Sequence, residues 1–172
     1  PGVVAEPGRQ GAEGQTFEAF FKGQHARLLR ALYLLCGDAA EAEDLMQDAF
    51  LKVWERWDRV GRMDDPEGYL FRTGMNLWRS RGRRALRAAR HLVLLRRPES
   101  HDPSTAVDDH DQVMRALAEL TPRQRDAIVV TELLEYPPTE AAHVLGVRPS
   151  TVRALTTQGR AAMKRHMEAD DE

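Results

Sequence analysis

Apolar residues recur at helical spacing through residues 42–57, and this periodicity constrains the fold more than any other feature of the sequence. They are Ala42, Leu45, Met46, Ala49, Val53, Trp54 and Trp57. A repeat of this length predicts one amphipathic helix that buries a single apolar stripe. Gly37 can end a preceding helix with a positive φ, and Asp38 with the later Glu41 matches a helix-capping box. Because similar periodicity covers most of the remaining chain, we predict an all-α fold.

Three further segments are predicted to be helices from their apolar spacing and their starting residues. One of them runs from residue 16 to residue 36. Asp65 can cap another, with Pro66 in the first turn, where proline costs little. Thr121 and Pro122 give the same kind of start in the second half of the chain.

Charge is segregated along the chain. Between Glu67 and Glu99 there is no other Asp or Glu, but there are nine arginines. They are Arg72, Arg79, Arg81, Arg83, Arg84, Arg87, Arg90, Arg96 and Arg97. A block of one sign usually meets phosphate, and the interleaved rings of Tyr69, Phe71 and Trp78 suit stacking on unpaired bases. The attraction of a helix C-terminus for cations accounts for only two of the nine, so we predict a nucleic-acid-binding helix here.

The overall composition is that of a packed protein and by itself indicates no class of partner. The 172 residues are 42% hydrophobic and carry a net charge of −2. The single cysteine, Cys36, excludes an internal disulfide and a cysteine-based zinc site. No apolar run reaches the ~18–20 residues of a membrane span, so no membrane insertion is expected. Residues 1–15 lack the apolar core of a secretory signal and are expected to be a disordered tail, which favours a cytoplasmic protein.

Residues 98–111 are predicted to form a flexible acidic linker between two small helical domains. Two prolines interrupt this segment, and no Lys or Arg occurs between Arg97 and Arg115. Such a segment buries too little apolar surface to fold alone. Its acidity is typical of a solvated linker.

Residues 138–157 match a helix-turn-helix pattern. Gly146 supplies the turn, and the small Ala142 lies where the two helices would cross. The shared core comes from Ala141, Leu145, Val147, Val152 and Leu155. The outer face of the second helix has Arg148, Ser150, Thr151, Arg153, Ala154, Thr157 and Arg160. Because Arg can bind guanine edges and Ser or Thr can bind bases or phosphates, we predict that this helix enters the major groove. A helical hairpin without a DNA role is the alternative.

The residues of both halves resemble one known family. AEDLMQDAFLKVWERW followed by DPEGYLFRTGMNLWRSRGRR resembles region 2 of bacterial sigma factors of the extracytoplasmic-function (ECF) group. LAELTPRQRDAIVVTELLEYPPTEAAHVLGVRPSTVRALTTQGRAAMKRH resembles region 4 of the same group. The resemblance implies a region 2 helical bundle within residues 16–97 and a region 4 helix-turn-helix within residues 112–167. It also implies a sigma factor, which directs RNA polymerase to promoters by recognising the −35 element and by melting and recognising the −10 element.

The same resemblance implies partners for particular residues. The first helix is expected to dock on the β′ subunit of core RNA polymerase through Asp44, Gln47, Asp48, Phe50 and Trp54. Contacts with the −10 strand are expected at Asn76, Arg79, Ser80, Arg83 and Arg84. Contacts with the −35 element are expected at Arg148, Ser150, Thr151, Arg153, Thr157 and Arg160. Further expected partners are the β subunit, promoter DNA and an anti-sigma factor, and the linker is implied to lie in the RNA channel of polymerase.

Two residues of the region 2 segment depart from the family pattern. Ser80 stands where many members have Asp or Asn, and Gly74 replaces the usual alanine. A glycine inside a helix should weaken it by roughly 1 kcal/mol. Both departures fall on the helix assigned to the −10 strand.

Several alternatives stay open at the level of sequence. The polar side of residues 42–57 could be ordinary solvated surface, and Arg153 could contact phosphate rather than a base. The chain could also be a stand-alone helix-turn-helix regulator with a partner-binding N-terminal module, or a structural adaptor that binds polymerase without directing initiation. The six histidines form no His-Glu-x-x-His pair, and no nucleophile elbow or phosphate loop occurs. Neither an enzyme activity nor a cofactor or metal is expected.

Overall fold

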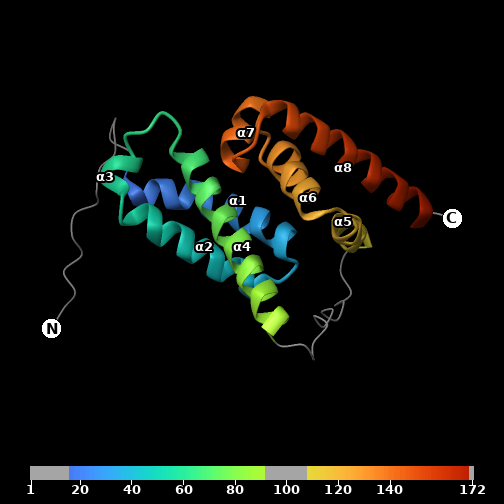
Figure 1. Cartoon of the computed structure of the whole chain (residues 1–172). Coiled ribbons are helices and arrows are strands. Elements are labelled where there is room, and N and C mark those ends of the chain that lie inside the picture. Colours follow the sequence, from blue (N-terminus) through green and yellow to red (C-terminus); the bar gives the residue numbers. More distant parts are fainter. Residues whose placement is uncertain (1–15, 92–107, 171–172) are drawn as a thin grey trace.

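The computed structural model describes residues 16–91 and 108–170, with side chains described at 16–84 and 112–168. These residues form helices and no sheet, as predicted (Figure 1). The N-terminal half contains α1 (Phe17–Cys36), α2 (Ala39–Trp54), α3 (Trp57–Val60) and α4 (Pro66–His91). The C-terminal half contains α5 (Asp108–Ala118), α6 (Pro122–Ile128), η2 (Val129–Leu133), α7 (Pro138–Leu145) and α8 (Pro149–Asp170). The tail expected at 1–15 and residues 98–107 of the expected linker lie outside the described residues, while α5 begins inside that linker.

The predicted helix starts are confirmed by their hydrogen bonds. Side-chain oxygens at each cap accept a backbone N–H three residues later, which satisfies a donor that the helix itself cannot use. The cap and donor pairs are Thr16 with Ala19, Asp38 with Glu41, Asp65 with Gly68, and Thr121 with Gln124. Gly37 ends α1 with a φ of 73°, a left-handed value that favours glycine.

The prediction of one helix through Trp57 is wrong. Helix α2 ends at Trp54, and Trp57 opens the one-turn helix α3. The break lies at Arg56, whose φ of −122° and ψ of 17° depart from helical values. Trp57 is nevertheless fully buried, so the periodicity predicted which residue faces the core although it missed the turn before it.

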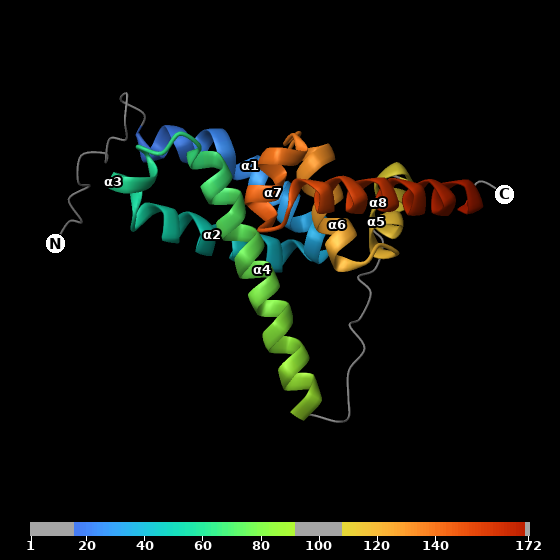
Figure 2. The same ribbon diagram turned by 45° about the horizontal axis from the view of Figure 1, so that its top comes forward.

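Helices α1, α2 and α4 pack against one another, and α6, α7 and α8 form a second group with α5 at its edge (Figure 1). Helix α4 lies at the boundary, because it packs on α1 and α2 on one side and on α7 on the other. Figure 2 shows the C-terminal end of α4 extending away from both groups. This helix therefore links the two halves and also presents a free end.

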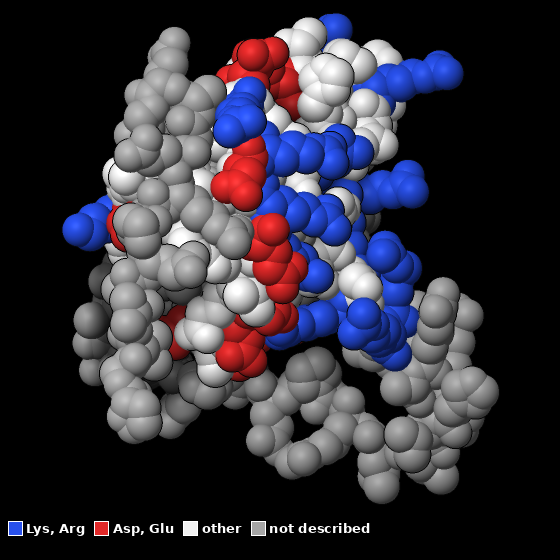
Figure 3. All heavy atoms as spheres, turned by 90° about the vertical axis from the view of Figure 1, so that its left-hand side faces the viewer, with Lys and Arg blue, Asp and Glu red and all other residues white. Residues whose placement is uncertain are grey.

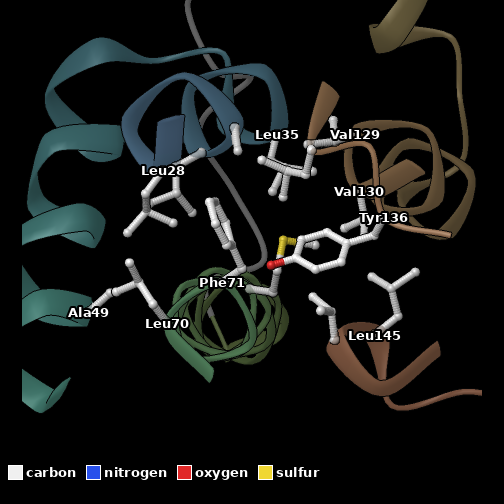
Figure 4. Close-up of a cluster of buried hydrophobic side chains, with 14 of the residues drawn as sticks. Leu28, Leu35, Ala49, Leu70, Phe71, Val129, Val130, Tyr136 and Leu145 are labelled. Atoms are coloured by element: carbon white, nitrogen blue, oxygen red, sulfur yellow. The ribbon is translucent and has the colours of Figure 1, made fainter. Parts of the chain in front are cut away.

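The two halves share one apolar core, which sequence reasoning did not predict (Figure 4). Tyr136 of the C-terminal half lies beside Phe71 of α4, with ring centroids 6.2 Å apart. Leu28 and Leu35 of α1 are buried in the same cluster, together with Val130 from η2. The two helical groups, which are separate along the sequence, are therefore in direct contact in space.

Candidate protein- and nucleic-acid-binding surfaces

An apolar groove lies between the start of α1 and the second half of α2. Its lining residues are Phe17, Glu18, Phe21, Lys22, Gln47, Phe50, Leu51 and Trp54. The rings of Phe17 and Trp54 meet edge-on with centroids 4.7 Å apart, and those of Phe21 and Phe50 do the same at 4.7 Å. Leu51 is 56% exposed, although large apolar side chains are normally withdrawn from water. Such a rigid aromatic floor with an exposed aliphatic side chain suits the docking of an apolar partner surface.

The structure brings only some of the predicted docking residues into this groove. Gln47, Phe50 and Trp54 line it, whereas Asp44 and Asp48 lie outside the lining. Phe50 is only 4% exposed, so its ring forms the floor of the groove rather than a projecting contact.

Asp48 is half exposed and accepts a hydrogen bond from Arg81 of α4 at 2.9 Å. Its carboxylate is therefore engaged within the N-terminal half. Sequence reasoning missed Leu51 and Phe21. Leu51 could have been found, because it is an apolar residue on the polar side of the α2 stripe.

The basic face of α4 is exposed over part of its length. On the side of the molecule shown in Figure 3, Lys and Arg side chains gather together and a column of Asp and Glu side chains borders them. Asn76, Arg83 and Arg84 are exposed and Ser80 is partly exposed. These four residues remain available for a nucleic-acid strand.

Arg79, the fifth residue assigned to the −10 strand, is turned toward the C-terminal half instead. Its Nε and Nη2 atoms donate to Asp126 Oδ2 at 2.9 and 2.8 Å, and its Nη1 donates to Leu145 O at 3.0 Å. The side chain of Asp126 is only 8% exposed. Burial raises the pKa of the Asp126 carboxyl, and the nearby charges of Arg79 and Arg125 only partly offset that rise. Because burial costs a charged pair about as much as its attraction returns, this contact is not expected to add much stability between the halves.

Two more arginines join the halves through backbone carbonyls. Arg27 of α1 donates to Leu134 O, and Arg125 of α6 donates to Leu35 O at 3.1 Å. The Arg27 guanidinium also lies 5.5 Å from the centroid of the Phe71 ring. Burial lowers the pKa of Arg125. Each arginine satisfies a carbonyl near the end of a helical segment in the opposite half, where cations are favoured.

The helix-turn-helix is present as predicted. Helices α7 and α8 are joined at Gly146, which has a φ of 67°. Val152 is fully buried and Leu155 packs against the core, so the opposite side of α8 faces outward. The outward residues are Arg148, Ser150, Arg153, Thr157 and Arg160, with Thr151 partly buried.

Arg160 of α8 is already paired. Its Nη2 donates to Glu132 Oε1 at 2.6 Å and its Nε donates to the same oxygen at 3.2 Å. Both side chains are well exposed, so water screens this pair and DNA could displace it at little cost. Arg153, near the start of α8, is exposed, and the described residues give no ion pair for it.

Other classes of site find no support in the described part of the chain. No group of three or more His, Cys, Asp or Glu residues there could hold a metal ion. Within the same residues no helix is both long and apolar enough to cross a membrane. Burial raises the pKa of the Cys36 thiol, which donates to Asp38 O at 3.1 Å. This cysteine is a packed side chain rather than an activated nucleophile.

Comparison with known proteins finds a family match in each half of the chain. Residues 20–91 match the family model of sigma-70 region 2, and residues 110–163 match that of sigma-70 region 4. The chain is 26% identical to the RNA polymerase sigma-E factor of Streptomyces avermitilis, over 90% of this chain and 87% of that protein. It is 28% identical to the ECF RNA polymerase sigma factor SigC of Mycobacterium tuberculosis, over 92% and 86%. In structure it is similar to the sigma factor RpoE from Bartonella quintana, solved in complex with the anti-sigma factor NepR. That match has a TM-score of 0.76 at 22% identity and covers 90% of this chain and 98% of the other.

Proposed function

The chain belongs to the sigma-70 family, as an ECF sigma factor that directs RNA polymerase to promoters, and we propose how its surfaces divide that work. Region 2 occupies residues 16–97, the linker residues 98–111, and region 4 residues 112–167. Region 2 binds core polymerase and the −10 strand, and region 4 binds the −35 element. The observation that carries this division is the placement of an apolar groove on region 2 and an exposed cationic α8 face on region 4 of one chain.

The polymerase contact is assigned to the groove and its polar margin. Leu51 and Phe21 are exposed side chains of the groove, while the buried Phe50 forms its floor and Trp54 lines it. Gln47 supplies a polar group within the groove, and Asp44 and Asp48, which lie outside its lining, are assigned to the polar margin of the contact. A buried apolar centre with a polar rim is the usual anatomy of a specific protein interface.

The DNA contacts are assigned to two separate helices. Helix α4 offers Asn76, Ser80, Arg83 and Arg84 to the −10 strand, and Arg79 becomes a contact only after its present partners release it. Helix α8 follows a helix-turn-helix turn and therefore enters the major groove of the −35 element. Arg153 lies on its outward face one turn into the helix, where a bidentate contact to a guanine suits an arginine.

The partners and the cellular setting follow from this role. Core RNA polymerase and promoter DNA are the obligatory partners, and an anti-sigma factor is a further one, as for the relative solved with NepR. In this role the chain acts by recruitment rather than as an enzyme. Its working place is the cytoplasm, with polymerase on the nucleoid.

Promoter binding with and without core polymerase tests the proposal. Random duplex DNA is selected against the full chain alone and against the chain bound to core enzyme. We expect enrichment of two spaced elements only in the presence of core enzyme. Specific duplex binding by the chain alone would instead indicate a stand-alone regulator, and polymerase binding without any enriched sequence would indicate an adaptor.

A further inference from the structure

A cleft with a volume of about 660 Å³ lies between α4 and the C-terminal half. Its lining consists of Trp78, Arg79, Gly82 and Arg83 from α4, Pro122, Arg123 and Asp126 from α6, and Leu145, Gly146, Val147 and Leu155 from the helix-turn-helix. Small-molecule sites typically have volumes of roughly 300–1,000 Å³ and combine apolar walls with a few polar groups. The cleft therefore has the size and the composition of a site for a small ligand.

The cations of the cleft come from both of its sides. Arg83 of α4 and Arg123 of α6 are exposed, and the described residues give no ion pair for either. A ligand held between these helices can therefore meet two guanidinium groups that are not engaged elsewhere in the described residues. Because the planar fork of arginine matches phosphate oxygens bidentately, this pair of arginines favours a ligand with phosphate groups.

Asp126 is the acceptor of the cleft. Its Oδ2 atom accepts both hydrogen bonds from Arg79, at 2.9 and 2.8 Å, and within the described residues no donor is given for Oδ1. A carboxylate has about four lone-pair sites, whereas the side chains of tryptophan and arginine offer only donors. Asp126 is thus the only side chain of the lining that can accept a hydrogen bond from a ligand. The part of the ligand that meets it must present N–H or O–H groups.

Trp78 supplies a flat face in the same cleft, because its ring is partly exposed. Tryptophan rings stack on nucleobases. Guanine presents N1–H and N2–H donors side by side, which suit a carboxylate, whereas adenine has an acceptor at N1. We propose that this cleft is a binding site for a guanine nucleotide, whose base stacks on Trp78 and whose two donors meet Asp126. Its phosphates extend to Arg83 and Arg123.

This ligand is additional to the polymerase and the promoter, and the inference depends on neither of those assignments. The test is isothermal titration calorimetry of the full-length chain with GTP, ATP, guanosine and pyrophosphate as separate titrants. GTP should bind saturably, and ATP should bind about tenfold or more weakly, because it lacks the paired donors. Guanosine and pyrophosphate should each bind more weakly than GTP, since each has only part of the ligand. Absence of GTP binding would overturn the proposal, even if a single-stranded oligonucleotide binds, and equal affinities for GTP and ATP would overturn it too.

Two substitutions on α4 test whether GTP binds in this cleft. Gly82 shares a helix face with Trp78 and Arg79, and a Cβ at Gly82 would meet no atom within 4 Å. Leucine is a good helix former, so Gly82→Leu should keep α4 intact, occupy the cleft and cause loss of measurable GTP binding. Trp78→Leu should weaken GTP binding by about fivefold or more through lost stacking. If both variants bind GTP as the wild type does, the nucleotide binds elsewhere and the proposal fails.

Two further substitutions test the phosphate and base contacts. Arg123→Gln should weaken GTP binding but leave guanosine binding unchanged. The matched control is Arg84→Gln, which removes an exposed arginine of α4 outside the cleft lining and should keep GTP affinity within about twofold of the wild type. An equal loss in Arg123→Gln and Arg84→Gln would indicate a general charge effect and would overturn the phosphate assignment.

Asp126→Asn tests recognition of the guanine edge. Because Asp126 also binds Arg79, loosening of the cleft would change the affinities for GTP and ATP alike. Loss of base recognition would instead lower the ratio of the ATP and GTP dissociation constants, since an amide presents donors as well as an acceptor. We expect this ratio to fall toward one, and a ratio equal to that of the wild type would overturn the assignment of Asp126.

Discussion

Replacement of Leu51 gives the sharpest single-residue test of the polymerase-docking groove. Complete burial of a leucine side chain stabilises by about 1.5–3 kcal/mol, and Leu51 is still 56% exposed in the free chain. If a partner covers the exposed part of Leu51, the complex gains about 0.8–1.7 kcal/mol of binding free energy. This gain corresponds to roughly a 4- to 18-fold change in Kd. Leu51→Ala should weaken binding to core RNA polymerase by that factor. Leu51→Asp should weaken it further, because a carboxylate would be desolvated in the groove.

Folding should be unaffected by either Leu51 variant, since an exposed helix position opens no cavity when it is truncated. The assay is competition for fluorescently labelled core enzyme, with thermal unfolding measured in parallel. Met167, which is 37% exposed near the end of α8, provides the matched control as Met167→Ala. Equal Kd values for wild type, both Leu51 variants and the control would refute the assignment of the groove to polymerase.

Three further predictions test the DNA surfaces and the helix packing. Arg83→Ala with Arg84→Ala should reduce promoter melting and flatten its salt dependence, measured by permanganate reactivity of unpaired thymines; normal melting at every salt concentration would remove these residues from the −10 surface. Arg153→Ala should cost about 1–3 kcal/mol at one base pair of the −35 element, and a uniform loss across single-base variants would show a phosphate contact instead. A Cβ at Gly159 would lie 2.8 Å from a side chain of α6, so Gly159→Ala should lower the free energy of unfolding by about 1–3 kcal/mol. A Cβ at Gly82 would have no atom within 4 Å, so Gly82→Ala should raise the free energy of unfolding by about 0.5–1 kcal/mol. A gain in stability from both substitutions would contradict this account of α8 packing.

The helices and their ends could be predicted from sequence because their signals are local. A capping oxygen lies three residues from its donor, and Gly146 has its positive φ within the turn that it forms. The spacing of apolar residues also predicted which side chains are buried, and Val152, for example, has no exposed surface. The break before Trp57 was missed because the apolar spacing continues through it.

Contacts between distant segments could not be predicted in this way. Nothing near Arg79 in sequence indicates Asp126, since the pair depends on how α4 meets α6 and α7 in space. Gly74 was expected only to weaken its helix. In the structure a Cβ at this position would lie 3.1 Å from Leu28 Cδ1, so the glycine permits α4 to approach α1 closely. Tertiary packing thus accounts for Gly74, which its low helix propensity alone would make unfavourable.

Run-off transcription in a defined system tests the central claim most directly. Core RNA polymerase, the full-length chain and a promoter fragment selected with the holoenzyme are combined, and transcripts are mapped at their 5′ ends. The account predicts a transcript with one start site that requires the chain and is lost when either the −10 or the −35 element is scrambled. Initiation that is the same without the chain, or that ignores both elements, would contradict it.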